Sequence, residues 1–255
     1  MKLSIADITA ILDETTASAM SWCLLELARH PEMQTKLRKE IAETQLEALQ
    51  YDDDPELSDD ETMEMPYLNA VIKEVLRFHP GVYLGMRVAL KDEILPLSEP
   101  IKTRSGKYIT EIPIPAGQIL SLNIASYQRY DTCVQLIFLI QNRTFCFHRL
   151  KDIWGEDADV FRPERWLERP KEKLHIGVYS NLLTFGTGYR PCIGWRFTVL
   201  ELQALLVTLL PVFEFSVPEG SPRIMRIPSA VMTPALEGQL EKGGQLPLMV
   251  TRLAT

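Results

Sequence analysis

The residues best suited to chemistry gather around one cysteine. Cys192 follows Pro191 and stands shortly before a long apolar stretch. Three nearby glycines let the backbone turn tightly and approach a flat group closely; they are Gly186, Gly188 and Gly194. A helix start beside a thiol favours the thiolate, so this loop suits a metal ligand or a nucleophile. The plainer alternative is a structural cysteine, because free cysteine is often buried.

The whole loop favours the first alternative. Residues 185–194 read FGTGYRPCIG, which resembles the haem-binding loop of the cytochromes P450, Phe-x-x-Gly-x-Arg-x-Cys-x-Gly, at every fixed position. The resemblance implies that Cys192 is the thiolate ligand of the iron in haem b, iron protoporphyrin IX. It also implies that Arg190 pairs with a haem propionate. The haem-binding set that it implies is Phe185, Gly186, Gly188, Arg190, Cys192 and Gly194.

A second motif lies upstream, at Glu74 and Arg77. The two residues are three apart, so in a helix they share one face and can form an ion pair. Taken alone, such a pair is usually a surface pair of little energetic value. The cytochromes P450, however, complete a buried Glu-x-x-Arg with the arginine of a Pro-Glu-Arg segment, and residues 163–165 read Pro-Glu-Arg. The resemblance therefore implies a structural triad of Glu74, Arg77 and Arg165 that serves folding and haem retention.

A third motif lies near the N-terminus, at Glu14 and Thr15. An acid beside a hydroxyl is uninformative alone, because threonine in a helix often bonds to its own backbone. The resemblance implies that both are catalytic, as the acid and the alcohol that relay protons toward the dioxygen site. The family places small residues before this motif, whereas Ile11 and Leu12 stand here. A bulky Leu12 beside the oxygen site puts turnover in question but leaves iron ligation unaffected.

Together the motifs make the chain similar to fungal, microsomal-type cytochromes P450. The implied activity is a monooxygenase reaction that inserts one atom of O2 into a lipophilic organic substrate, with electrons from NADPH that arrive only through a reductase. Residues 81–87 and 229–234 are implied to face the substrate. Two alternatives remain: a non-catalytic truncated product that binds haem weakly or not at all, and a haem-thiolate enzyme that rearranges peroxides.

The motifs cover nearly all 255 residues, yet the family's proteins are considerably longer. Residues 1–255 are therefore expected to form a single incomplete domain, a partial cytochrome P450 fold that is mainly α with small β-sheets and lacks the N-terminal half. The family is typically anchored at the endoplasmic reticulum membrane. Because no anchor is found in this sequence, the chain itself is expected to be cytoplasmic.

One segment departs from the family pattern. Residues 130–149 (YDTCVQLIFLIQNRTFCFHR) interrupt a stretch that reads SYQR followed by LKDIWG when they are removed. An arginine stands at both edges, as a translated intron would leave it. The segment is therefore predicted to be a non-native insertion, a retained intron in preference to a genuine insertion. Residues 1–12 are expected to share that origin, which would explain Ile11 and Leu12.

The composition excludes several other classes of protein. Apolar residues make up 46% and charged residues 24%, which excludes disordered, collagenous and coiled-coil chains. A net charge of −7 without a long basic run argues against nucleic-acid binding. The cysteines lack the spacing of a secreted disulfide framework or a metal clamp; they are Cys23, Cys133, Cys146 and Cys192.

The apolar pattern predicts the elements that position these motifs. A helix that is apolar on most sides, and therefore buried, is expected at residues 4–29. Further helices are expected at 32–49, 67–78 and 195–212, the first of them amphipathic and on the surface. Short strands are expected at 85–90, 94–97, 108–114 and 118–124. Residues 51–66 and 152–170 are predicted to be loops.

Overall fold

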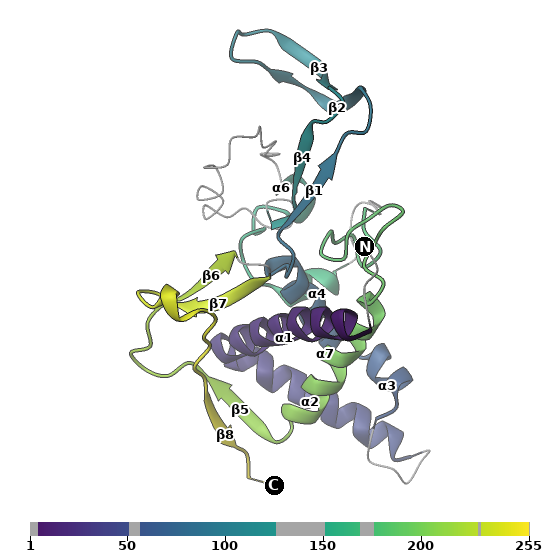
Figure 1. Cartoon of the computed structure of the whole chain (residues 1–255). Helices are drawn as coiled ribbons and strands as arrows, with labels where there is room; N and C mark the ends of the chain where they lie inside the picture. Colours follow the sequence, from purple (N-terminus) through teal and green to yellow (C-terminus); the bar gives the residue numbers. More distant parts are fainter. Residues whose placement is uncertain (1–4, 51–56, 126–150, 169–175, 229–230, 255) are drawn as a thin grey trace.

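The computed structural model describes residues 5–50, 57–125, 151–168, 176–228 and 231–254 (Figure 1). The long helices of this part are α1 (Ile5–Arg29), α2 (Pro31–Ala48), α4 (Pro66–Phe78) and α7 (Trp195–Leu209). The shorter ones are α3 (Asp59–Glu64), α6 (Lys151–Trp154) and the 3-10 turns η2 (Pro163–Trp166) and η3 (Leu240–Lys242).

The strands form antiparallel pairs. In the chain as described, these are β1 (Leu84–Val88) with β4 (Ile119–Asn123), β2 (Glu93–Lys102) with β3 (Tyr108–Ile114), β5 (Phe213–Ser216) with β8 (Met249–Arg252), and β6 (Ile224–Pro228) with β7 (Met232–Leu236). Figure 1 shows β1–β4 and β2–β3 extending away from the helices as one arm. The predicted fold class, mainly α with small β-sheets, is confirmed.

Helix α1 lies at the centre of the helical body. It contacts α2, α4, α7, β5 and β7, and from Thr16 onward most of its side chains are buried, as the sequence predicts. Burial of such large apolar side chains is the main stabilising contribution to the fold. The fully buried side chains of this core include Leu25, Leu27, Leu68, Ile72 and Leu202.

Helix α2 is amphipathic, as predicted, and fixes the start of α4. It turns Leu37 and Ile41 into the core and leaves most of its charged side chains exposed. The Glu40 carboxylate accepts the backbone N–H groups of Tyr67 and Leu68, both at 2.7 Å. These N–H groups belong to the first turn of α4, where no intrahelical acceptor exists, so Glu40 caps the helix from a neighbouring one.

Two predictions of irregular structure are wrong. Residues 59–64, expected to lie in a loop, form α3, because Ser58 and Glu61 build a capping box: the Glu61 N–H donates to Ser58 Oγ, and the Ser58 N–H donates to Glu61 Oε2. Residues 152–170, also expected to be a loop, contain most of α6 and all of η2. The other boundaries differ by a few residues, except that β2 extends to Lys102 instead of ending at residue 97.

Two of the predicted segments lie wholly or partly outside the residues that the structure describes. The predicted insertion at residues 130–149 lies outside the described residues. So do residues 229 and 230, the first two of the implied substrate-facing segment 229–234. None of the helices in the described residues is both long and apolar enough to cross a membrane.

Candidate functional site

The loop that carries Cys192 is closed by its own backbone. The Cys192 N–H donates to the Phe185 carbonyl at 2.7 Å, and the Gly186 N–H donates to the Leu183 carbonyl at 2.9 Å. Gly186 and Gly188 adopt positive φ angles, 73° and 76°, which favour glycine. The sequence thus folds into a fixed loop that delivers Cys192 directly before α7.

One side chain anchors the loop to the core. Phe185 is buried and its ring lies 6.0 Å from that of Tyr179 and 6.5 Å from that of Trp195. Tyr179 was not selected from the sequence, although aromatic residues close to a glycine-rich loop are candidates for such an anchor. Phe185 thus holds one side of the loop against the core, while Cys192 remains exposed and available to a ligand.

The Cys192 thiol is exposed, and large apolar side chains are exposed around it. Tyr189 and Ile193, three residues before Cys192 and one after it, are 106% and 97% exposed, and Phe197 in the first turn of α7 is 56% exposed. Soluble proteins rarely leave such side chains together in water unless they contact something else. The sulfur donor of Cys192 is therefore flanked in the chain by exposed apolar side chains.

Arg190 adds a cation to this surface. Its side chain is exposed, and among the residues that the structure describes no carboxylate lies within 4.0 Å of its guanidinium. An unpaired guanidinium can bind a carboxylate through two parallel hydrogen bonds. It stands two residues from Cys192, so an anionic edge of a ligand and the sulfur donor can be engaged together.

These features fit an iron porphyrin. The donor set is one sulfur, and the described residues contain no cluster of three or more His, Cys, Asp or Glu side chains that could hold a metal ion by themselves. Among the residues that the structure describes, no atom would lie within 4 Å of a Cβ placed on Gly188, so they leave open space beside the loop there. A flat apolar group with a central metal and carboxylate substituents matches the sulfur, the apolar side chains and Arg190 together.

The other cysteine that the structure describes has a different environment. Cys23 in α1 is completely buried, and that burial raises the pKa of its thiol to about 12. It therefore stays protonated at neutral pH and is an inert core residue. Cys133 and Cys146 lie outside the described residues.

Glu74, Arg77 and Arg165 are brought together in one buried cluster. Arg77 Nη2 lies 2.7 Å and Arg165 Nε 3.0 Å from the same oxygen, Oε1 of Glu74. Glu74 and Arg77 are both fully buried. A buried ion pair is stable only if its remaining groups are also hydrogen-bonded. Here Arg77 Nη1 also donates to the Ala158 carbonyl at 2.6 Å.

The triad has further partners that the sequence analysis did not identify. Trp166 Nε1 donates to Glu74 Oε2 at 2.9 Å, and the Arg162 N–H donates to Oε1 at 2.8 Å. Burial of Asp157 favours its neutral form, but hydrogen bonds from Arg162 and Arg165 outweigh this and lower its pKa. In the sequence, this network is indicated only by the many aromatic and charged residues between positions 154 and 166.

Glu14 is the first residue of α1 whose side chain the structure describes, and Thr15 follows it. Glu14 is exposed and Thr15 is partly buried. The neighbouring Thr16 is buried, and its Oγ1 lies 3.3 Å from Oγ1 of Thr198 in α7. The structure thus links the segment that carries Glu14 and Thr15 to the helix that follows Cys192, through a residue that sequence reasoning did not select. The side chains of Ile11 and Leu12 lie outside the described residues.

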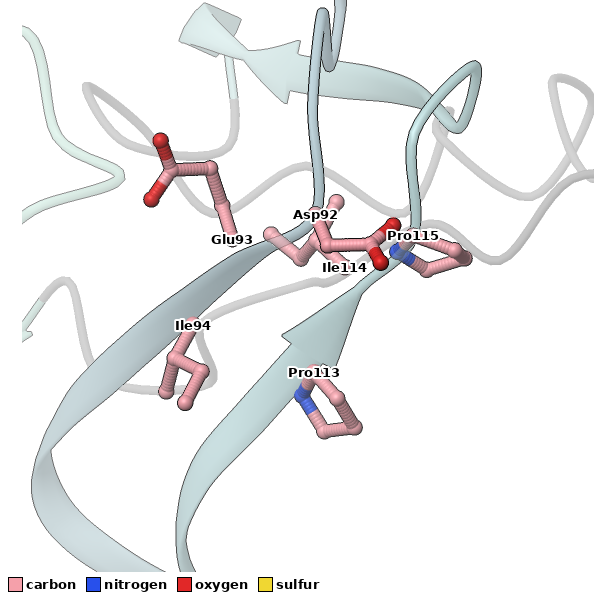
Figure 2. Close-up of a pocket in the computed structure, with 6 residues that line it drawn as sticks. All are labelled: Asp92, Glu93, Ile94, Pro113, Ile114 and Pro115. Atoms are coloured by element: carbon pink, nitrogen blue, oxygen red, sulfur yellow. The ribbon is translucent and has the colours of Figure 1, made fainter.

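One pocket of the described residues lies away from these motifs. It has a volume of about 770 Å³ at the base of the β2–β3 hairpin and is lined by Asp92, Glu93, Ile94, Pro113, Ile114 and Pro115 (Figure 2). Asp92 already accepts the Ala116 N–H at 2.8 Å, and Glu93 pairs with Lys91 at 3.2 Å. Because none of the predicted site residues line it, this pocket is not the candidate site.

Comparison with known proteins gives matches over most of the chain. The family model for cytochrome P450 matches residues 13–131 and 140–241. The chain is 36% identical over 238 residues to cytochrome P450 monooxygenase 205 of Postia placenta, which covers 93% of this chain and 39% of that protein. It is also 36% identical over 244 residues to cytochrome P450 monooxygenase claP of Ampulloclitocybe clavipes, covering 94% and 40%.

A third relative, ganoderic acid synthetase CYP5150L8 of Ganoderma lucidum, is 39% identical over 210 residues, or 81% of this chain and 34% of the relative. The chain therefore spans about two fifths of the length of the fungal proteins that it matches. The family match extends over most of the sequence and includes the Cys192 loop, the Glu74–Arg77 helix and the Arg165 segment. The chain belongs to the cytochrome P450 family.

Proposed function

We propose that this chain is the haem-binding part of a haem-thiolate monooxygenase, with Cys192 as the iron ligand. The observation that carries the proposal is the exposed Cys192 thiol on a loop that its own backbone holds closed, next to exposed Tyr189 and Ile193. When bound, haem would supply the dioxygen chemistry, because a thiolate ligand favours O–O cleavage. Haem b is the form that the family resemblance implies.

The residues around Cys192 would bind and shield this group. Tyr189, Ile193 and Phe197 supply apolar area, which gains about 25 cal/mol for each Å² removed from water. Arg190 would pair with a carboxylate at the edge of the ligand. Gly186 and Gly188 hold the backbone in the turn that presents the sulfur. Exclusion of water around a charged sulfur strengthens its electrostatic interactions.

Glu14 and Thr15 are proposed to handle protons. Glu14 is exposed and can exchange protons with water, whereas Thr15 is partly buried and can pass them inward from its hydroxyl. The Thr16–Thr198 contact fixes this part of α1 against α7. Glu74, Arg77 and Arg165 are assigned a structural role, because their charges are engaged with one another inside the protein.

The proposed reaction inserts one oxygen atom of O2 into a lipophilic substrate. A reductase would deliver electrons from NADPH, and the proposed location of the full-length protein is the endoplasmic reticulum membrane. Residues 81–87 and 229–234 are proposed to face the substrate. The relatives support the reaction class through their names, cytochrome P450 monooxygenases 205 and claP.

Haem titration tests the proposal. The 255-residue chain is titrated with haemin, and Cys192→Ala is compared with Cys23→Ala, which removes the buried thiol instead of the exposed one. The expected result is one haem per chain for the wild type and for Cys23→Ala, and weakened binding for Cys192→Ala. An absence of haem uptake by the wild type would contradict the proposal and favour a non-catalytic product.

Turnover then separates the remaining alternative. A monooxygenase consumes O2 when supplied with NADPH and a reductase. An enzyme that rearranges peroxides works without either and consumes the peroxide itself. Turnover that depends on the peroxide alone would replace the proposed reaction while leaving the assignment of Cys192 intact.

A further inference from the structure

One residue, Met232, joins helix α1 to both segments that are proposed to face the substrate. The carbonyl of Met232, the first residue of β7, accepts hydrogen bonds from Ser18 Oγ at 2.7 Å and from Trp22 Nε1 at 2.8 Å. The Met232 N–H donates to the Gly81 carbonyl at 2.8 Å. Ser18 and Trp22 are both buried, so water does not compete for these bonds.

Trp22 also contacts the same region through its ring. It stacks on His79, with the ring centroids 4.1 Å apart and the planes at 11°. His79 directly follows α4 as its C-cap residue, two residues before Gly81. A Cβ on Gly81 would lie 3.6 Å from Val231, so the two segments are also in direct contact. Trp22 therefore restrains the residues after α4 and the start of β7 at the same time.

The two donors occupy one face of α1. Ser18 and Trp22 are four residues apart, and Glu14 is four residues before Ser18, so all three lie along the same side of the helix. Two residues before Ser18, Thr16 contacts Thr198 in α7, the helix that follows Cys192. Within a short stretch, α1 thus contacts both the helix after the proposed iron ligand and the proposed substrate-facing segments.

We propose that Ser18 and Trp22 are positioning residues that hold residues 81–88 and 231–236 as one unit on α1. They would thereby set which part of a lipophilic substrate reaches the group bound at Cys192. The part of this inference that concerns substrate rests on the proposed function, whereas the mechanical coupling of the two segments does not.

Hydrogen exchange tests the coupling in the whole 255-residue chain without haem. Ser18→Ala and Trp22→Phe each remove one donor to Met232, and Trp22→Phe keeps a ring against His79. Ser21→Ala is the matched control, because the Ser21 hydroxyl bonds to the Ala17 carbonyl of its own helix. The expected result is amide exchange about fivefold faster in peptides from both 79–88 and 224–236, with no change in the control.

Faster exchange in only one of the two regions, or in neither, would overturn the coupling. Ser18→Ala removes a single oxygen atom, so it keeps the test decisive if Trp22→Phe fails to fold. The result does not depend on haem, and failure of the proposed function would instead appear as an absence of haem binding by the wild type.

A product ratio tests the positioning role. Lauric acid is used as a lipophilic probe with many similar methylene groups. The haem-loaded chain is supplied with O2, NADPH and a reductase, and the positional isomers of the hydroxylated product are counted. The expected result for Ser18→Ala is a change of about twofold or more in the isomer ratio, with the ratio of Ser21→Ala unchanged. An unchanged isomer ratio would show that Ser18 and Trp22 stabilise the fold without positioning the substrate. A wild type that binds haem but forms no oxidised product would contradict the substrate part together with the proposed reaction.

Discussion

His79 Nε2 lies 2.7 Å from Glu26 Oε1, and both side chains are buried. On the other side of the ring, Arg226 Nε donates to His79 Nδ1 at 3.1 Å. Arginine can only donate, so Nδ1 accepts and the proton of the neutral ring lies on Nε2, facing Glu26. The ring therefore completes a hydrogen-bonded chain from β6 through the end of α4 to α1.

The Glu26 carboxylate should make stability depend on pH. Burial favours its neutral form, but the hydrogen bond to His79 and the nearby Arg29 and His30 outweigh burial and lower its pKa. Such a group stabilises the fold at pH values above its unfolded pKa, and the contribution is lost as the pH falls through its folded pKa.

Glu26→Gln should therefore be less stable than the wild type at pH 7, by about 1–3 kcal/mol. The difference should narrow as the pH falls below about 4.3, the ordinary value for glutamate. Urea unfolding of both proteins at several pH values measures it. A difference that stays constant down to pH 3 would show that the ionised carboxylate is not the stabilising species.

Loss of Arg77 should destabilise the fold strongly. Arg77→Ala leaves Glu74 buried with one of its cations missing, which costs about 3–5 kcal/mol in comparable cases. Lys36→Ala is the matched control, because Lys36 pairs with Glu164 at a similar distance but on the surface. That change should cost less than about 1 kcal/mol. Equal losses for the two variants in urea unfolding would argue against the structural role of the triad.

Substitution of Gly186 should strain the Cys192 loop. Gly186 has a φ of 73°, and the nearest atom that the structure describes would lie 3.8 Å from a Cβ there, so the cost arises from backbone conformation and not from a clash. Gly186→Ala should lose about 1–2 kcal/mol and bind haem more weakly. Gly85→Ala, at a glycine without a positive φ, should change haem affinity little. Unchanged haem affinity in Gly186→Ala would mean that the loop tolerates another conformation.

Native-state alkylation should distinguish the two described cysteines. Cys192 is exposed and should react with iodoacetamide quickly, whereas buried Cys23, with its pKa raised to about 12, should react only on unfolding. Mass spectrometry of the labelled peptides measures both rates, and bound haem should protect Cys192 alone. Protection of Cys23 in place of Cys192 would contradict the assigned ligand.

The parts of the site that the sequence predicted are those with fixed local spacing. The loop around Cys192 and the Glu74–Arg77 pair each depend on residues a few positions apart, so their types and order were visible before the fold. The Arg165 segment was added by resemblance, because nothing local connects it to Glu74, ninety-one positions away.

The parts that could not be predicted depend on distant packing. Thr16 meets Thr198 across 182 positions, and Trp22 meets the Met232 carbonyl across 210. A hydroxyl or an indole in a helix gives no sign of which distant group it will contact. Helix α3 was missed for a different reason, since its acidic, proline-flanked sequence resembles a loop until the Ser58–Glu61 capping box is recognised.

The central claim is that Cys192 is the thiolate ligand of a haem iron. A carbon monoxide difference spectrum of the haem-loaded, dithionite-reduced chain tests it most directly, with Cys23→Ala as the control and Cys192→Ser as the test variant. The wild type and Cys23→Ala should show the red-shifted Soret band of thiolate-ligated haem, and Cys192→Ser should lose it. The same band in Cys192→Ser, or its absence from haem-loaded wild type, would show that Cys192 is not the ligand of the iron.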